Sequence, residues 1–290
     1  LGTEIWVKHE NHTPIGAFKV RGGLTYMDAL MKRSHPPRHL ITATRGNHGQ
    51  SIPFAARAHG IKVTVFVPHG NSSEKNAAMK AWGADVVEHG ADFDLAREEA
   101  EQRAAEDNAE FVPSFSRDLI RGVATGAFEL MTACPNLDLI YCPIGMGSGI
   151  CSLIQVRNLL GRNTKIVGVV SAHADAIAQT FETGLLASTT TAHTFADGVA
   201  TRIPNIAAVD TIREGVDRIV RVTDNEVAEA IRKLYRCTHN IAEGAGATAY
   251  AAACQEKEKI RGRRVAVMLT GGNIDKDWLV QVLSGRTPEV

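Results

Sequence analysis

Short runs of β-branched and other apolar residues alternate along the chain with longer segments in which apolar positions recur every three or four residues. The short runs predict strands and the longer segments predict helices. The predicted strands are Glu4–Lys8, Leu40–Thr42, Val63–Val67, Asp85–Glu88, Leu139–Cys142, Ile166–Val170, Arg218–Val222 and Val265–Leu269. The predicted helices are Gly16–Lys32, Asn47–Ala58, Ser72–Trp82, Asp92–Asn108, Asp118–Thr132, Ser148–Leu160, Asp224–Cys237 and Gly244–Lys257.

Strands that alternate with helices in this way are typical of an α/β fold, in which open twisted parallel sheets carry helices on both faces. The stretch from Ser34 to His39 interrupts the pattern with two prolines and marks a passage between two lobes. We therefore predict a small domain, residues 39–115, inserted in a large domain made of residues 1–38 and 116–290. A ligand is expected between the two lobes.

The composition excludes several classes of partner. The 290 residues include 32 basic and 32 acidic side chains, so no excess charge attracts the chain to nucleic acid or to an anionic membrane. The uncharged stretch from Leu139 to Val156 contains a proline and several glycines, which indicates strand, loop and helix rather than a membrane span. Five cysteines without metal-binding spacing are interpreted as core thiols of a cytoplasmic protein.

One glycine-rich loop follows the predicted strand that ends at Cys142 and leads directly into a helix. It contains Gly145, Met146, Gly147 and Ser148. Glycines there allow backbone N–H groups to converge on an anion at the start of the helix, and phosphate is the natural ligand. A dinucleotide site is disfavoured, because the spacing is GxGxG rather than GxGxxG and the next strand runs into Ser171 without a ribose-binding acid. A simple tight turn is the alternative.

Three further segments carry polar or reactive residues. The segment Ala43-Thr-Arg-Gly-Asn-His-Gly-Gln50 follows a predicted strand, although it could simply be a helix cap with Asn47 as the N-cap. Thr270-Gly-Gly-Asn273 follows the last predicted strand and is, by itself, only a turn. Lys19 comes after Phe18 and a turn rich in proline and glycine. Most lysines are solvated, but one buried beside an aromatic ring has a lowered pKa and attacks carbonyl groups, so its partner would be an aldehyde.

Together, the four segments resemble the fold type II pyridoxal-phosphate enzymes, specifically the serine/threonine dehydratase and serine racemase group, whose fold is that of the tryptophan synthase beta subunit. The resemblance covers nearly the whole chain, from Lys19 to Asn273. It implies pyridoxal 5'-phosphate as cofactor and Lys19 as the catalytic residue that forms the Schiff base. The other cofactor-binding residues that it implies are Phe18, Asn47, Gly145, Met146, Gly147, Ser148 and Thr270.

The resemblance also implies a small amino-acid substrate, whose carboxylate is bound by Thr44, Arg45, Gly46, Asn47 and His48. Two more segments, Asp197–Val199 and Glu243-Gly244, match family sequences around the cofactor ring. Thr270 would face the pyridine nitrogen, where a hydroxyl can hydrogen-bond without protonating the ring. A weaker electron sink favours β-elimination over transamination. The expected reaction removes water from a β-hydroxy amino acid, with Lys19 as general base, and yields a 2-oxo acid and ammonia.

Departures from the family pattern narrow this hypothesis. Racemases have a second catalytic base where this chain has Arg45, and a guanidinium group does not deprotonate, so racemase activity should be minor or absent. Relatives that bind a divalent cation have acids where Val170 and Ala176 stand, so no metal is expected. The few residues after Asn273 leave no room for the regulatory domain of biosynthetic threonine deaminases, and feedback inhibition through it is not expected.

Several alternatives stay open. Arg45 strengthens binding of the α-carboxylate, contacts a second substrate carboxylate as in 3-hydroxyaspartate, or pairs with a protein acid outside the pocket. Threonine, serine, 3-hydroxyaspartate and a β-aryl serine are all candidate substrates. On the same fold, a β-replacement enzyme or an amino-acid racemase is the second hypothesis, and a non-catalytic phosphate- or nucleotide-binding module is the third. Relatives of this group are commonly dimers or tetramers, so a homodimer or homotetramer is expected.

Overall fold

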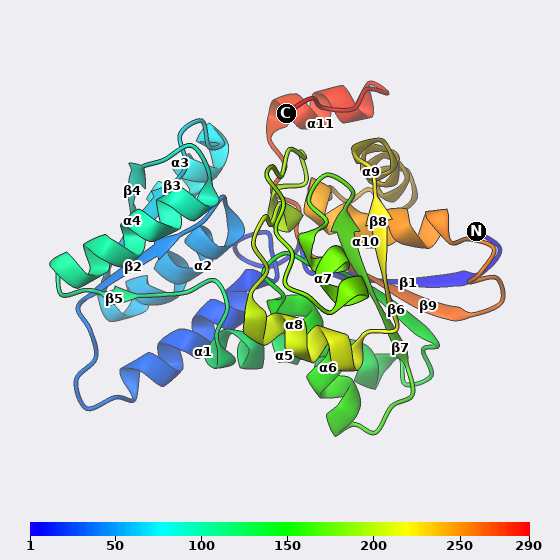
Figure 1. Ribbon diagram of the computed structural model, residues 1–290, viewed down its shortest axis with the longest axis horizontal. Coiled ribbons are helices and arrows are strands. Elements are labelled where there is room, and N and C mark those ends of the chain that lie inside the picture. The colour runs from blue at the N-terminus through cyan, green and yellow to red at the C-terminus, as the bar shows by residue number, and fades with distance from the viewer. The chain divides into compact units, whose positions relative to one another are not determined.

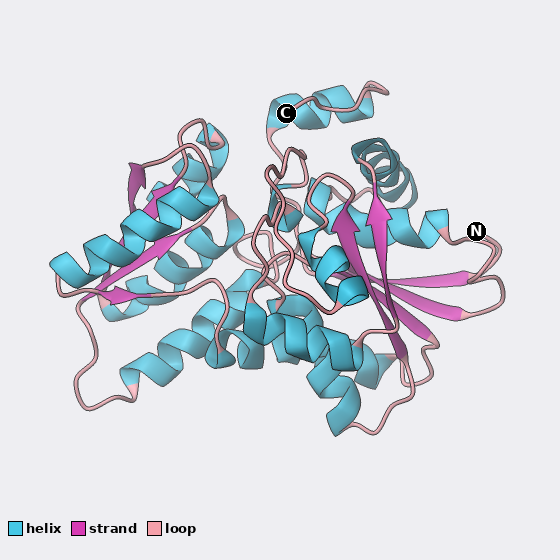
Figure 2. Cartoon of the chain, viewed as in Figure 1, coloured by secondary structure: helices cyan, strands magenta, loops and turns pink.

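The computed structural model describes residues 1–290 and divides into two compact units (Figure 1). Unit 1 consists of Leu1–His12 and Val123–Val290, and unit 2 is the continuous segment Thr13–Gly122. Each unit contains its own parallel sheet, with strands in magenta and helices in cyan in Figure 2. The expected α/β fold of parallel sheets covered by helices is therefore confirmed.

Unit 1 is built on a five-stranded sheet in the order β1-β9-β6-β7-β8. Its strands are β1 (Glu4–His9), β6 (Leu139–Pro143), β7 (Lys165–Ser171), β8 (Arg218–Val222) and β9 (Arg264–Leu269). Its helices are α6 (Ser148–Leu159), α7 (Ala176–Thr183), α8 (Ile206–Gly215), α9 (Asp224–Thr238), α10 (Gly244–Gln255) and α11 (Lys276–Leu283), with the 3-10 turn η2 (Asp197–Val199). Helix α5 (Arg117–Ala133) begins in unit 2 and ends in unit 1.

The central strands β6, β7 and β9 of the unit 1 sheet are buried on both faces, which explains why they read as nearly continuous apolar runs. One face carries Tyr141, Val167 and Val267, which pack with α9 and α10 in the largest apolar core. Helix α10 consists mainly of alanine and glycine, so it lies close to the strands beneath it. On the opposite face, a Cβ at Gly168 would lie 3.3 Å from the Ile150 side chain of α6.

Unit 2 has a four-stranded sheet in the order β4-β3-β2-β5. Its strands are β2 (His39–Ala43), β3 (Lys62–Val67), β4 (Asp85–Glu88) and β5 (Glu110–Phe111), and its helices are α1 (Lys19–Met31), α2 (Asn47–Ala56), α3 (Ser73–Ala81) and α4 (Phe93–Glu106), with the 3-10 turn η1 (Arg57–His59). Alternate residues of β2 face opposite layers, since Leu40 packs with α1 and α2 whereas Ile41 packs with α4.

All the predicted strands and helices are present, with bounds that differ by a few residues. Helix α1 begins at Lys19 rather than at the predicted Gly16, because Gly16 has a φ of +68° and closes a turn by donating its N–H to the Thr13 carbonyl at 2.9 Å. The strand and α-helices not predicted from the sequence are β5, α7, α8 and α11. No helix is both long and apolar enough to span a membrane.

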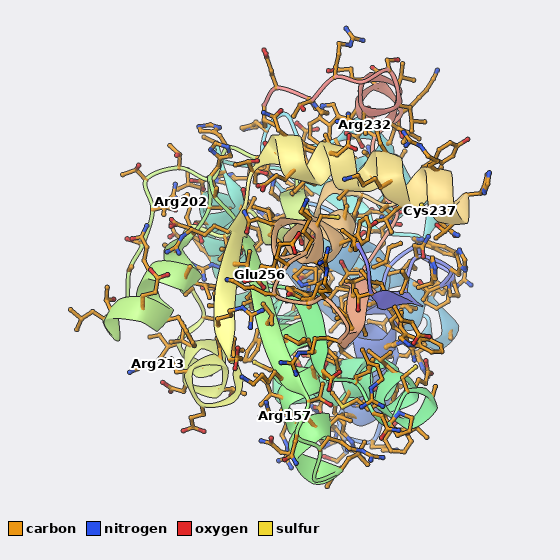
Figure 3. All side chains as sticks on the ribbon, turned by 90° about the vertical axis from the view of Figure 1, so that its right-hand side faces the viewer. Arg157, Arg202, Arg213, Arg232, Cys237 and Glu256 are labelled. Atoms are coloured by element: carbon orange, nitrogen blue, oxygen red, sulfur yellow. The ribbon has the colours of Figure 1, made fainter.

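Unit 2 is larger than the predicted small domain, because it also includes residues 13–38 and 116–122. Tyr26 and Leu30 of α1 pack with Ile52 of α2 in one core, which attaches the first helix to this unit. The domain bounds given above, 39–115 within 1–38 and 116–290, stay a prediction. The interpretation of all five cysteines as core thiols is wrong: Cys142 and Cys151 are buried, but Cys237 is exposed at the end of α9 (Figure 3).

Candidate active site

Lys19 is the first residue of α1, and its backbone is fixed by a contact with α2. The Ser51 hydroxyl donates a hydrogen bond to the Lys19 carbonyl at 2.6 Å. The two helices approach so closely here that a Cβ at Gly23 would lie 2.2 Å from the Ser51 hydroxyl oxygen. The start of α1 is therefore held at a defined position relative to α2 and to the loop that precedes it.

The Lys19 side chain differs from that of an ordinary surface lysine. It retains some accessible surface, but the surrounding protein desolvates the ammonium group and lowers the pKa of Lys19 to about 8. Its Nζ lies 5.1 Å from the centre of the Phe18 ring. A much larger fraction of this amine than of an ordinary lysine is therefore neutral and nucleophilic near physiological pH.

The segment Thr44–His48 runs from the end of β2 into the first turn of α2. The Thr44 hydroxyl accepts a hydrogen bond from the Gly46 backbone N–H at 2.9 Å, which folds the segment back on itself. Gly46 is the N-cap residue of α2, and Asn47 is the first residue of the helix. The interpretation of Asn47 as a helix cap is therefore wrong.

His48 is the second residue of α2 and carries a buried, neutral imidazole. Desolvation, together with the nearby positive charge of Lys19, lowers the pKa of His48 to about 3. The ring forms a hydrogen bond with the backbone of Val112, whereas Nε2 is buried without a hydrogen-bond partner. Buried polar atoms without partners are rare in folded proteins and often mark functional sites. The segment Thr44–His48 thus has unused hydrogen-bonding capacity close to Lys19.

In unit 1, the glycine-rich loop lies between β6 and α6. Gly147 has a φ of +99°, a conformation that favours glycine, and is the N-cap of α6, while Ser148 begins the helix and is buried. Gly145 approaches the backbone of η2 so closely that a Cβ there would lie 2.2 Å from the Gly198 carbonyl oxygen. The first N–H groups of α6 have no acceptor within the helix, so the loop forms a cup suited to a phosphate group.

Thr270 lies at the same edge of the sheet as this cup. It follows β9, which pairs with β6 in parallel, so the two strands end at the same edge. Thr270 is buried, and the next residue, Gly271, accepts a hydrogen bond from the Glu243 backbone N–H at 3.0 Å. A Cβ at Gly246 would lie 2.3 Å from the Gly271 carbonyl oxygen, so the start of α10 is packed directly against the Thr270 loop.

The predicted site residues therefore fall into two groups. In unit 2 they are Phe18, Lys19, Thr44, Arg45, Gly46, Asn47 and His48, and in unit 1 they are Gly145, Met146, Gly147, Ser148 and Thr270. Sequence reasoning missed Ser51, although its position four residues after Asn47 places both on one face of α2. The resemblance placed Asp197–Val199 around the cofactor ring, and in the structure Gly198 of this segment packs against the cup.

Comparison with known proteins establishes the family. The model of the family described as "Pyridoxal-phosphate dependent enzyme" matches residues 1–271. The chain belongs to this family. Pyridoxal phosphate is therefore its cofactor, and the resemblance to the serine/threonine dehydratase group is confirmed.

Two curated relatives illustrate the similarity of these pyridoxal-phosphate enzymes. The L-threonine ammonia-lyase of Geobacter sulfurreducens is 34% identical over 276 residues, which cover 95% of this chain and 68% of that protein. The L-threo-3-hydroxyaspartate ammonia-lyase of Saccharomyces cerevisiae is 30% identical over 289 residues, which cover 99% of this chain and 88% of that protein. Among solved structures, the processed form of threonine deaminase isoform 2 from Solanum lycopersicum superimposes with a TM-score of 0.91 at 28% identity, covering 98% of this chain and 79% of that one.

The residues present fit this cofactor. The cup has the glycines that a close-fitting phosphate requires, because side chains at Gly145 or Gly147 would meet the opposing backbone or strain the loop. The Lys19 amine has the lowered pKa needed to attack an aldehyde at neutral pH. Gly145 to Ser148 would thus hold the phosphate, and Lys19 would bind the aldehyde carbon.

The lowered pKa of Lys19 predicts how cofactor loading depends on pH. With a pKa of about 8, about one tenth of the amine is neutral at pH 7, against about one in three thousand at the ordinary value of 10.5. Only the neutral amine attacks the aldehyde, so the rate at which cofactor-free protein incorporates pyridoxal phosphate should rise with pH and level off above about pH 8. Stopped-flow absorbance measures this rate. A rate that continues to rise tenfold per pH unit up to pH 10 would contradict the lowered pKa.

Proposed function

We propose that the protein is a pyridoxal-phosphate-dependent ammonia-lyase that removes water from a β-hydroxy amino acid and releases a 2-oxo acid and ammonia. The observation that carries this proposal is the Lys19 amine, which lies at the fixed start of α1 and has a pKa of about 8. Such a group can act first as a nucleophile and then as a base under the same conditions. The names of the two relatives given above support the same reaction class.

Different residues of the chain have different roles in the proposed reaction. When bound, pyridoxal phosphate supplies an aldehyde for the amino group of the substrate and a ring that withdraws electrons from Cα. The neutral Nζ of Lys19 removes the proton from Cα, and its lowered pKa keeps it available for that transfer near neutral pH. The segment Thr44–His48 supplies polar groups for the substrate carboxylate, and the buried His48 stays uncharged beside it.

We attribute the preference for elimination over transamination to Thr270. Its hydroxyl is buried at the carboxyl end of β9, where it would hydrogen-bond the pyridine nitrogen without transferring a full proton to it. A ring held by this hydroxyl would stay unprotonated and would supply only weak electron withdrawal, which would favour loss of the β-hydroxyl group over transamination.

Replacement of Thr270 by aspartate tests this argument. The carboxylate should favour a protonated ring, which delocalises charge away from Cα, and the fraction of turnovers that end in transamination should rise relative to elimination. Both products can be quantified by chromatography after reaction with serine. Thr270→Ser, which retains the hydroxyl, is the matched control and should keep the wild-type ratio. An unchanged ratio in Thr270→Asp would count against the role given to Thr270.

The substrate is best identified with a panel of β-hydroxy amino acids. We expect 2-oxo acid and ammonia in equal amounts from at least one of threonine, serine, 3-hydroxyaspartate and β-phenylserine. If Arg45 binds a second carboxylate, Arg45→Ala should lower kcat/KM for 3-hydroxyaspartate at least tenfold more than for threonine, as expected for a lost charge-assisted contact. A protein that releases no ammonia from any of the four, or only racemises them, is not the proposed lyase.

Assembly and location complete the proposal. The protein is proposed to form a homodimer or homotetramer, as expected for the serine/threonine dehydratase group. A cytoplasmic location is supported by five cysteines that are all free thiols, which persist in a reducing compartment. Light scattering of the purified protein measures the number of subunits directly.

A further inference from the structure

Three connecting loops at the amino ends of the unit 1 strands line a solvent-open cavity of about 370 Å³. The loops are residues 135–138 before β6, 161–165 before β7 and 263–264 before β9. Because β6, β7 and β9 are parallel, this edge of the sheet is opposite to the one that carries the cup and Thr270. The cavity therefore lies outside the site described above, and its volume is in the range of small-molecule pockets.

The lining of this cavity is strongly basic. Its charged residues are Asp138 and the four cations Arg162, Lys165, Arg263 and Arg264. The single acid is already engaged, because Asp138 accepts a hydrogen bond from the Arg264 backbone at 2.8 Å and lies 3.8 Å from its guanidinium group. Lys165 pairs with Asp217 at 2.8 Å. Arg162 and Arg263 are exposed and take part in no ion pair, so positive charge here is not neutralised.

These two arginines differ from others nearby that stabilise the fold. Arg157, labelled in Figure 3 on the last turn of α6, donates to the Gly215 carbonyl at 2.7 Å and to the Asn158 side chain. Arg218 pairs with Glu256, which is also labelled there. Arg162 and Arg263 form no such contacts, so their guanidinium groups are available to a ligand.

The loops that carry these charges are joined to one another by hydrogen bonds. The Thr164 hydroxyl donates to the Leu137 carbonyl at 2.8 Å, and the Lys165 backbone N–H donates to the Asp138 carbonyl at 3.0 Å. The Asp138 backbone N–H in turn donates to the Arg264 carbonyl at 2.8 Å. Leu137 and Thr164 are the buried residues of the lining, and we call them its floor. A floor ordered on folding spares a ligand part of the entropic cost of binding.

We propose that this cavity binds a small phosphorylated anion. Guanidinium groups match the oxygens of a phosphate in pairs of hydrogen bonds, and two of them from different loops balance a dianion. The amide side chains of Asn136 and Asn163 line the same cavity and supply neutral donors. The opening to solvent allows the anion to enter and leave without movement of the fold.

Calorimetric titration of the pyridoxal-phosphate-loaded protein with inorganic pyrophosphate tests the proposal. Bound pyridoxal phosphate occupies the cup, so the binding of pyrophosphate measured in this titration cannot come from the cup. We expect saturable binding that weakens at least tenfold in the double variant Arg162→Ala/Arg263→Ala. Arg261→Ala is the matched control, because Arg261 is an exposed neighbour that lies outside the lining and pairs with Glu258 at 3.8 Å. It should change the affinity less than twofold.

The titrations are run at constant ionic strength, since general screening would otherwise imitate a site. The absence of saturable binding to the wild-type protein would overturn the proposal. An equal loss in Arg261→Ala and in the double variant would also overturn it, because the effect would then come from overall surface charge. All substituted side chains are exposed, so thermal melting curves should coincide and exclude unfolding as the cause.

Discussion

Lys19→Ala should reduce the release of ammonia by about four orders of magnitude, because it removes both the nucleophile that binds the cofactor and the base that accepts the Cα proton. The variant should also lose the visible absorption band of the covalently bound cofactor, since free pyridoxal phosphate can be removed by dialysis. Both properties are measured on one preparation, by a 2-oxo acid assay and an absorption spectrum.

Lys32→Ala is a matched control for this variant. Lys32 lies at the other end of α1, is largely exposed and pairs with Asp28 at 2.7 Å. Its removal changes the net charge in the same way but should leave both the spectrum and the activity unchanged. Wild-type ammonia release by Lys19→Ala would show that another group performs the chemistry, and the assignment of Lys19 would be wrong.

Gly145→Ala should weaken binding of pyridoxal phosphate by about 10- to 100-fold, which corresponds to the 1–3 kcal/mol typical of overpacking. The new methyl group would lie 2.2 Å from the Gly198 carbonyl oxygen. Because this oxygen is a backbone atom, the cup must deform to relieve the clash. Equilibrium titration of cofactor-free protein with pyridoxal phosphate, followed by absorbance, gives the affinity.

A second glycine separates this effect from a general loss of stability. Gly262 is on the surface of unit 1 with a φ of +71° and nothing within 4 Å of a Cβ position. Gly262→Asn should leave the affinity for the cofactor unchanged, because asparagine tolerates this backbone conformation. If Gly145→Ala binds the cofactor as tightly as Gly262→Asn, the cup does not hold the phosphate.

Local pattern predicted most of the fold but not the elements with weak or short signals. Strands such as β7 and β9 are buried on both faces, so their apolar runs are unmistakable. Strand β5 has only two residues, and α7 and α11 are the shortest α-helices, with eight residues each. Order in the sheet is a separate matter: β9, the last strand along the chain, lies between β1 and β6, and no local pattern indicates this.

The same distinction applies to the site. The cup, the Lys19 segment and the Thr270 loop are recognisable because each requires particular residue types within a few positions. The contacts that support these segments are not recognisable from the sequence, because the contacting residues are far apart along the chain. Ser51 contacts Lys19, and Gly198 contacts Gly145. The unmatched Nε2 of His48 likewise becomes visible only when burial and the Val112 contact are known.

The pairing of β1 with β9 has a consequence for synthesis of the protein on the ribosome. Residues 4–9 form their ladder with residues 264–269, so the first strand cannot pair until residue 269 has emerged. The continuous segment Thr13–Gly122 faces no such delay and can acquire its tertiary structure while translation continues. Pulsed proteolysis of stalled nascent chains should therefore find this segment protected well before the strands on either side of it.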